Sequence, residues 1–419
     1  MPIQDIVTPV PNTFELFLLC ESEYLSPYLI KSIHQHNINF YMSNVEDPEL
    51  MNTVEYSRLI NTICKNPSIN DEIMDKLIEY EINFNTLDSW NQSALHSLCK
   101  NPSLTKYMLL QLKEIGPMLA NFLLIDDDKI SPVYYLCSSF NLTLDTIDFL
   151  FELFPINNSF YLLDDFEESM LHYIFSNSKI SPDLIRKLIE RGLSFDCKGS
   201  CNDTPLHMLF KKNYVTYEII CAFLCPERLH PFYIENNYGE TPLHHLLENE
   251  VMTPMILQKL IDSHIRNFEY KSTKIENPGN EQNTPLHFLF RNINLTIDIV
   301  EILFQMNYNI NLLNRNKETP LHYYCSSDNF KIDIFLYIVK EYSFEEERGS
   351  IMITNIICKD IRDNTSIDLL CKNPDISKEV IKELVHKRII KKENFNLCIS
   401  NHKDMFSDDE KKEIYNLFI

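Results

Sequence analysis

Short amphipathic segments recur along the chain. In the segment 184–191, apolar residues stand at positions i, i+1, i+4 and i+5, which places Leu184, Ile185, Leu188 and Ile189 on one stripe of a helix. A helix this short cannot bury its stripe alone, so neighbouring helices must pack against each other. The pattern therefore predicts an array of short, packed helices.

A four-residue block marks where many of these helices begin. Thr at the N-cap accepts backbone N–H bonds, and Pro suits the first helical position. The block occurs identically four times: Thr204, Pro205, Leu206 and His207; Thr241, Pro242, Leu243 and His244; Thr284, Pro285, Leu286 and His287; Thr319, Pro320, Leu321 and His322. Degenerate copies begin at Ser93, Ser131, Ser169 and Thr365.

A second capping residue follows each block at a fixed distance of twelve residues, and an apolar residue precedes it, as a hydrophobic staple requires. The caps are Ser26, Asn70, Thr105, Thr143, Ser181, Thr216, Thr253, Thr296 and Ser377, with Lys331 as the exception. We expect two helices per repeat, in ten repeats that start near residues 14, 58, 93, 131, 169, 204, 241, 284, 319 and 365.

A Thr-Pro-Leu-His block that opens the first of two helices, preceded by a pattern such as Asn236-x-x-Gly239-x, resembles the ankyrin repeat. The resemblance covers about residues 14 to 390. It implies an all-α repeat solenoid of ankyrin-type helix-turn-helix stacks with short β-hairpin finger loops. The fingers are expected where Asp or Asn recurs five residues before the block, at Asp88, Asp126, Asp164, Asn236, Asn314 and Asp360.

The chain departs from that family in its repeat length. The shortest repeat has 35 residues, whereas about 33 is usual, and the two extra residues fall between the helices. Gly192 ends one second helix, and Asn307 and His264 stand at equivalent places. We expect an N-terminal lead-in at 1–13, the array at 14–394, and a C-terminal capping helix at 395–419 that begins with a capping box at Ser407 and Glu410.

The amino-acid composition argues against several classes of function. Six glycines in 419 residues leave no glycine-rich nucleotide loop. A formal charge of −22 argues against nucleic acid and against anionic membranes as partners. The N-terminus lacks the features of a signal peptide, and no apolar run approaches a membrane span, so we expect twelve reduced cysteines and a cytoplasmic location.

Histidine and cysteine recur at fixed repeat positions. The fourth block position holds His96, His172, His207, His244, His287 and His322. One imidazole per helix layer is too widely spaced for a metal site, and in the ankyrin family this imidazole bonds the block's Thr and a neighbouring carbonyl. The residue six positions after the repeat start is Cys in six repeats (Cys20, Cys64, Cys99, Cys137, Cys325 and Cys371) and Phe or Leu in others, which predicts a core position.

The sequence therefore predicts no catalytic residue, no cofactor and no metal. The remaining alternative of this kind is a metal-dependent or enzyme-associated protein that uses Cys197, Cys201, Cys221 and Cys225.

Partner-binding residues are expected on loops. Three repeats carry insertions, near 40–52, 266–282 and 343–360, which are either tolerated loops or recognition fingers. Candidate contacts there are Glu276, Asn277, Glu345 and Glu346; candidates at regular finger tips are Tyr238, Glu240, Arg315 and Lys317. A third candidate is the row of residues that follow the block (Tyr135, Tyr173, Met208, Phe288 and Tyr323), which serves either packing or binding.

We interpret the chain as a non-catalytic, monomeric scaffold or adaptor that binds a protein with a basic surface in a salt-sensitive manner. Its low Gly and abundant Asn, Ile and Lys resemble ankyrin arrays of AT-rich protists and large DNA viruses. This leaves open a viral or pathogen adaptor, in the host cytoplasm, that links a target to a ubiquitin ligase, although residues 401–419 lack the Leu-Pro-rich pattern of poxviral adaptors. A purely mechanical spacer is the third alternative.

Overall fold

The computed structural model describes residues 18–21, 25–34, 54–114, 121–155, 157–224, 230–270, 281–344, 356 and 358–418. The chain divides into two compact halves, residues 1–200 and 201–419. In both halves short α-helices alternate with turns, and no strand occurs among the described residues beyond one isolated bridge between Leu163 and Ser169. The expected all-α repeat fold is confirmed.

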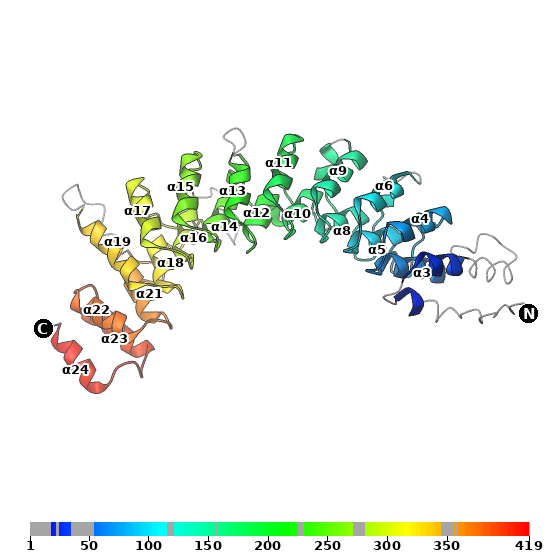
Figure 1. Ribbon diagram of the computed structural model, residues 1–419. Coiled ribbons are helices and arrows are strands. Elements are labelled where there is room, and N and C mark those ends of the chain that lie inside the picture. Colours follow the sequence, from blue (N-terminus) through cyan, green and yellow to red (C-terminus); the bar gives the residue numbers. More distant parts are fainter. Residues whose placement is uncertain are drawn as a thin grey trace, which may run out of the picture. The chain divides into compact units, whose positions relative to one another are not determined.

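In the N-terminal half, each repeat contributes a first and a second helix (Figure 1). First helices contact first helices of adjacent repeats, and second helices do the same, so the half consists of two helical layers. The pairs are α3 (Val54–Lys65) with α4 (Asp71–Glu79), α5 (Ala94–Lys100) with α6 (Lys106–Glu114), α8 (Pro132–Ser138) with α9 (Leu144–Leu153), and α10 (Met170–Phe175) with α11 (Pro182–Glu190).

The C-terminal half repeats this arrangement. Its pairs are α12 (Pro205–Phe210) with α13 (Tyr217–Phe223), α14 (Pro242–Glu248) with α15 (Pro254–Asp262), α16 (Pro285–Arg291) with α17 (Ile297–Gln305), α18 (Pro320–Ser326) with α19 (Ile332–Phe344), α21 (Ser366–Lys372) with α22 (Lys378–His386), and α23 (Lys392–Asn401) with α24 (Asp408–Asn416). The first helices α12, α14, α16, α18, α21 and α23 contact each other in that order. Short 3-10 helices lie at Asn157–Tyr161, Ser200–Asn202 and His230–Tyr233.

The capping residues predicted for the second helices are confirmed. In each of the nine, the side-chain oxygen accepts the backbone N–H three residues on, from Ser26 to Ser377. At the exception, Lys331, the Tyr324 hydroxyl replaces the missing cap: it accepts the Lys331 N–H at 2.9 Å and donates to the Lys331 carbonyl at 2.9 Å. Local capping chemistry therefore sets where these helices begin.

The expected fingers are short turns, and the antiparallel bridge between Leu163 and Ser169 closes the finger at 164–168. The Asn236 side-chain oxygen accepts the N–H groups of Tyr238 (2.9 Å) and Glu240 (3.0 Å), and Asp88, Asp164, Asn314 and Asp360 accept the equivalent pairs. Backbone bonds also close the fingers, as when the Asn236 N–H donates to the Glu240 carbonyl at 2.9 Å. Apart from the bridge between Leu163 and Ser169, no strand is assigned in the described fingers.

Each finger and several second helices end in a left-handed residue. The third residue after the finger's Asp or Asn has φ between 53° and 75° at Asn91, Lys129, Glu167, Gly239, Lys317 and Asp363. The ends of second helices are left-handed at Glu81, Gly192, His264, Asn307 and Arg388, with φ between 51° and 80°. Only two of these eleven positions are glycine, so the chain tolerates the strain at most of them.

An asparagine ladder joins consecutive repeats, and the sequence reading missed it. The eighth residue after the block start, in the turn between the two helices, is Asn66, Asn101, Asn177, Asn249, Asn292 or Asn373. Its amide donates to carbonyls of the preceding repeat, as when Asn292 donates to Leu247 (2.8 Å) and Asn249 (2.9 Å). The other five donate in the same way. The ladder occupies the longer turn that gives these repeats their extra length.

The core lies between the layers. The six cysteines that stand six positions after the repeat start are all buried, as expected, and so are Phe175, Phe210, Leu247 and Phe290 at the same position. At the C-terminal end, Phe395 of α23 packs against the rings of Phe406, Tyr415 and Phe418. The Ser407 and Glu410 side chains form the predicted capping box of α24. Lys378 and Lys382 of α22 both reach Glu410, which ties α24 to the second-helix layer.

Candidate protein-binding surface

The residue that follows the block forms a row across the first helices of the C-terminal half. We call Met208, His245, Phe288 and Tyr323 the first-helix row; Phe288 is buried, and the other three are half-buried. His245 packs edge-on against Phe288, with ring centroids 6.1 Å apart. Three of the row's four side chains are therefore partly exposed to solvent, and they stand on helices that pack against the core.

Three block histidines of the C-terminal half link their first helix to the next finger. His207 Nδ1 accepts the Thr204 backbone N–H at 3.0 Å, and its Nε2 donates to the Glu240 carbonyl at 3.0 Å. His244 makes the same contacts with Thr241 and with the Asn283 carbonyl, and His287 with Thr284 and Glu318. These are the contacts that the ankyrin resemblance implies for this imidazole.

Burial keeps these imidazoles neutral. It lowers the pKa of His207 to about 3 and that of His244 to about 4, since the charged ring would lose its hydration. The neutral ring has one accepting and one donating nitrogen, which matches the N–H and the carbonyl that face it. The block histidines therefore serve as structural links in this half.

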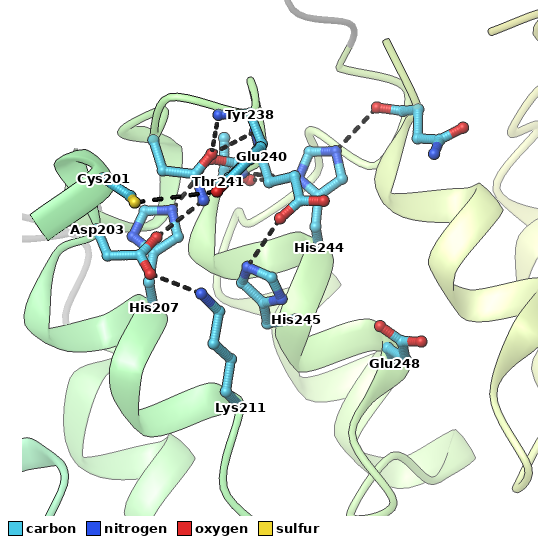
Figure 2. Close-up of polar contacts among 12 residues, drawn as sticks. Cys201, Asp203, His207, Lys211, Tyr238, Glu240, Thr241, His244, His245 and Glu248 are labelled. Carbon is cyan, nitrogen blue, oxygen red and sulfur yellow. Dashed lines mark hydrogen bonds and ion pairs between the residues drawn. The ribbon is translucent and has the colours of Figure 1, made fainter. Parts of the chain in front are cut away.

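A network of charged groups lies beside the row (Figure 2). The Glu240 carboxylate lies 3.3 Å from His245 Nε2, and Lys211 Nζ lies 2.6 Å from Asp203 Oδ2. Asp203 also accepts from the Asn236 amide at 2.8 Å. The network thus connects the finger at 236–240 to helices α12 and α14.

The Glu240 carboxylate is held in its charged form. Burial by itself would raise its pKa, but the hydrogen bond from His245 and the nearby charge of Lys211 help to outweigh burial and lower the pKa to about 2. A permanently charged carboxylate at this place gives the row an acidic border.

An open pocket of about 260 Å³ lies next to the network, where α12 and α14 end. Phe210 and Asn249 contribute to its lining together with the charged side chains of Lys211, Lys212, Glu248 and Glu250 and with His245. Arg291 of α16 holds Glu248, with Arg291 Nε 2.7 Å from Glu248 Oε1. The pocket is open to solvent, and its lining is mixed in charge.

The equivalent row residues of the N-terminal half are tied to their own fingers. The Tyr135 hydroxyl donates to Asp126 at 2.8 Å, and the Tyr173 hydroxyl donates to Asp164 at 2.6 Å. These bonds hold the tyrosine rings in place, half-buried, at the surface of α8 and α10.

The predicted contact residues lie in different settings. Tyr238, Arg315 and Lys317 are exposed at finger tips, whereas Glu240 is turned into the network with His245. Glu276, Asn277, Glu345 and Glu346 lie outside the described residues, as do most of the three insertions. The structure thus leaves the role of the insertions as a prediction.

The sequence reading did not single out Lys211, Glu248 or Arg291. They share the seventh position after the block start, where Lys100 and Lys372 also stand. This recurrence of charge at one repeat position is the signal that could have identified them.

The four cysteines of the metal alternative do not form a common site in the described chain. Cys197 faces the Ser169 hydroxyl at 3.5 Å, Cys201 is exposed with its sulfur 3.9 Å from the Tyr238 hydroxyl, and Cys221 lies on α13. Cys225 lies outside the described residues. Within the described ranges, no group of three or more His, Cys, Asp or Glu side chains is arranged to hold a metal ion.

None of the helices in the part of the chain that the structure describes is long and apolar enough to span a membrane.

Comparisons with known proteins yield structural likenesses alone. No family model matches the chain, and no curated protein matches it. Among solved structures, the chain is similar to the crystal structure of the ankyrin repeat domain of Bcl-3, described as a unique member of the IkappaB protein family. The identity is 13%, the alignment covers 59% of this chain and 97% of that chain, and the TM-score is 0.39.

Proposed function

We propose that the chain is a non-catalytic protein-binding repeat array, and that the first-helix row of its C-terminal half contacts the partner. The observation that carries the proposal is the row itself: three half-buried side chains and the buried Phe288 recur at one repeat position, and block histidines link α12, α14 and α16 to the fingers. A surface held rigid before binding loses little conformational entropy when it binds.

The charge of the chain supports a partner with a basic surface. The net charge is −22, and Glu240 borders the row as a permanent carboxylate. Opposite charge on the partner would speed association, and this attraction would weaken as salt screens it. Exposed Tyr238, of a residue type that often dominates interfaces, lies at the adjacent finger and is a further proposed contact.

A pair of matched methionine variants tests the proposal. Met208 lies in the row, whereas Met255 is exposed on the second helix α15 of the same half. Met208→Arg places a bulky cation in the contact and should weaken binding of a basic partner by about tenfold or more, because it adds both overlap and repulsion. Met255→Arg adds the same charge away from the row and should bind as the wild type does.

The measurement has two stages. Proteins captured by the wild-type chain from its native cells are compared with those captured by each variant, and the affinity of the purified partner is then measured at low and high salt. If a partner is lost by Met208→Arg and kept by Met255→Arg, the result supports the first-helix row as the partner contact. Equal binding by both variants would place the contact elsewhere, and an array that captures no protein would sink the proposal.

A further inference from the structure

The fingers of the N-terminal half carry exposed apolar side chains. We define the finger edge as Leu87, Trp90, Leu123, Ile125, Leu162, Leu163 and Phe166, which come from three consecutive repeats. Trp90 is 68% exposed and Phe166 is 51% exposed. Monomeric proteins seldom leave so many large apolar side chains exposed on adjacent segments without a binding role.

These side chains are not required by the packing of the fingers. Each of the three segments also supplies a buried aromatic residue, Phe84, Phe122 or Phe160, which fills the core below the turn. The finger edge is therefore apolar surface in addition to what the fold needs.

A backbone bond joins the first two fingers, and a side-chain bond joins the third finger to α8. The Asp127 N–H donates to the Trp90 carbonyl at 3.1 Å, and the Tyr134 hydroxyl donates to the Leu162 carbonyl at 3.1 Å. Asp88 fixes the turn around Trp90, and Asp164 fixes the turn around Phe166. The apolar side chains thus project from a preorganised backbone, which lowers the entropy that a partner's binding would cost.

The charge along the edge is acidic. Asp127, Asp128, Asp165 and Glu167 are exposed on these fingers, and Lys129 is the one exposed cation on the segments 83–92, 121–130 and 159–168. The described finger tips of the C-terminal half differ, since they include the exposed cations Arg315, Lys317 and Arg362. The C-terminal fingers also expose Leu313 and Ile361, so the N-terminal fingers are distinguished by having a single exposed cation, Lys129, beside their acidic side chains.

We propose that the finger edge of the N-terminal half, with its seven exposed apolar side chains bordered by Asp127, Asp128, Asp165 and Glu167, binds a cationic amphipathic segment of a partner protein. The partner's apolar side chains cover the edge, and its lysines or arginines pair with the acidic border. Adjacent first helices pack about 10 Å apart, and an α-helix advances about 10 Å in seven residues, so a helical partner would present one anchor per heptad. This surface is separate from the first-helix row and does not depend on it.

Trp90 allows a direct test, because it is the single tryptophan of the chain and lies in the proposed contact. The probe is a synthetic amphipathic peptide of about 21 residues with leucine at the a and d positions and lysine elsewhere. Binding should shift Trp90 emission to shorter wavelength, saturably, as water leaves the indole. The same peptide with glutamate in place of lysine should produce no shift.

Matched variants separate this site from non-specific attraction to an acidic protein. Phe166→Ser and Glu167→Lys should each weaken binding of the lysine peptide by about tenfold, through lost apolar contact and through repulsion. Glu167 is left-handed, and Lys129 and Lys317 occupy the same left-handed position in other fingers, so Glu167→Lys fits the fold. Phe140→Ser, which changes a phenylalanine that is 72% exposed away from the fingers, should bind as the wild type does.

Several outcomes would overturn the proposal. An unchanged Trp90 emission, or equal affinity of Phe166→Ser and Phe140→Ser, would show that the peptide does not cover the edge. A shift with phosphatidylcholine vesicles would point to a lipid surface, and a shift with protein concentration alone would point to a second copy of the chain. Either of these would replace the cationic segment as the occupant.

Discussion

At the scale of the residue, one position shows how different side chains meet the same need. The third helical residue after the cap accepts the cap's backbone N–H, and it is His in six blocks, Asp368 in α21 and Asn394 in α23. Histidine does more than the others, because its second nitrogen reaches a carbonyl of the next finger in the blocks of His207, His244 and His287. The imidazole thus joins a local cap to a contact between repeats.

This role predicts acid sensitivity. In the folded chain the pKa of His244 is about 4, below the ordinary value of about 6.5. Above pH 6.5 neither the folded nor the unfolded state binds the proton, so the free energy of unfolding is unaffected. As the pH falls from 6.5 toward 4, only the unfolded state is protonated, and stability is lost across that window.

His244→Asn tests this link. Asn can accept the Thr241 N–H, as Asn394 does for Lys391, but it loses the bond to the Asn283 carbonyl. We expect a lower urea midpoint at pH 7 and a shallower loss of stability between pH 6.5 and 4, by about one bound proton. His207→Asn should behave alike, because the pKa of His207 is also lowered by burial. A slope identical to that of the wild type in both variants would contradict the assignment.

At the scale of the element, the interactions that start a helix join residues close in sequence, whereas those that stack the repeats join residues far apart in sequence. A Ser, Thr or Asn cap needs only the N–H three residues on, so the caps of the second helices follow from sequence spacing. The asparagine ladder instead needs carbonyls about 40 residues earlier in the chain, such as Cys137 and Ser139 for Asn177. Its recurrence is visible in the sequence, but its bonding partners become evident only once the helices are stacked.

The ladder predicts a large cost for a small change. Asn292→Ala removes two donors and one acceptor and leaves the Leu247 and Asn249 carbonyls buried without them. We expect a loss of about 2–4 kcal/mol in the free energy of unfolding, measured by urea denaturation. Asn292→Asp keeps the volume and loses the donors, so it should be at least as destabilising. Asn267→Ala, at an exposed position, should change stability by less than about 0.5 kcal/mol.

If Asn292→Asp left the free energy of unfolding unchanged, Asn292 would act through its volume, and the hydrogen bonds of the ladder would not contribute to stability.

At the scale of the whole molecule, charge is the dominant feature. The 60 acidic side chains outnumber the 38 basic ones by 22. Ion pairs such as Lys106–Asp145 and Lys113–Glu152 are largely exposed, and exposed pairs of this kind contribute little to stability. Repulsion among the excess carboxylates should therefore outweigh them at low ionic strength.

This balance predicts stabilisation by salt. Raising NaCl from about 10 mM to about 150 mM shortens the Debye length from about 30 Å to about 8 Å and screens the repulsion. We expect the thermal unfolding midpoint, followed by circular dichroism, to rise over this range. KCl should act like NaCl, because screening depends on ionic strength. A midpoint that falls with salt would mean that the ion pairs dominate.

The candidate surfaces were only partly predictable. The first-helix row was visible in the sequence as a stripe of residues that follow the block. The exposed fraction of each side chain, however, depends on how α12, α14, α16 and α18 pack. Glu240 was expected at a finger tip for a partner, whereas the fold pairs it with His245. The finger edge combines residues of three repeats, and nothing in the spacing of Trp90, Ile125 and Phe166 along the chain shows that all three stay exposed.

The helix pairs, their caps and the core positions follow from the sequence, because hydrogen bonds to the residue three positions on and amphipathic stripes act within a few residues. The side chains that reach the next repeat and the apolar residues that stay exposed are instead set by how the repeats pack. Those outcomes depend on groups that are distant in the chain and meet only after the repeats stack, so no local pattern could specify them.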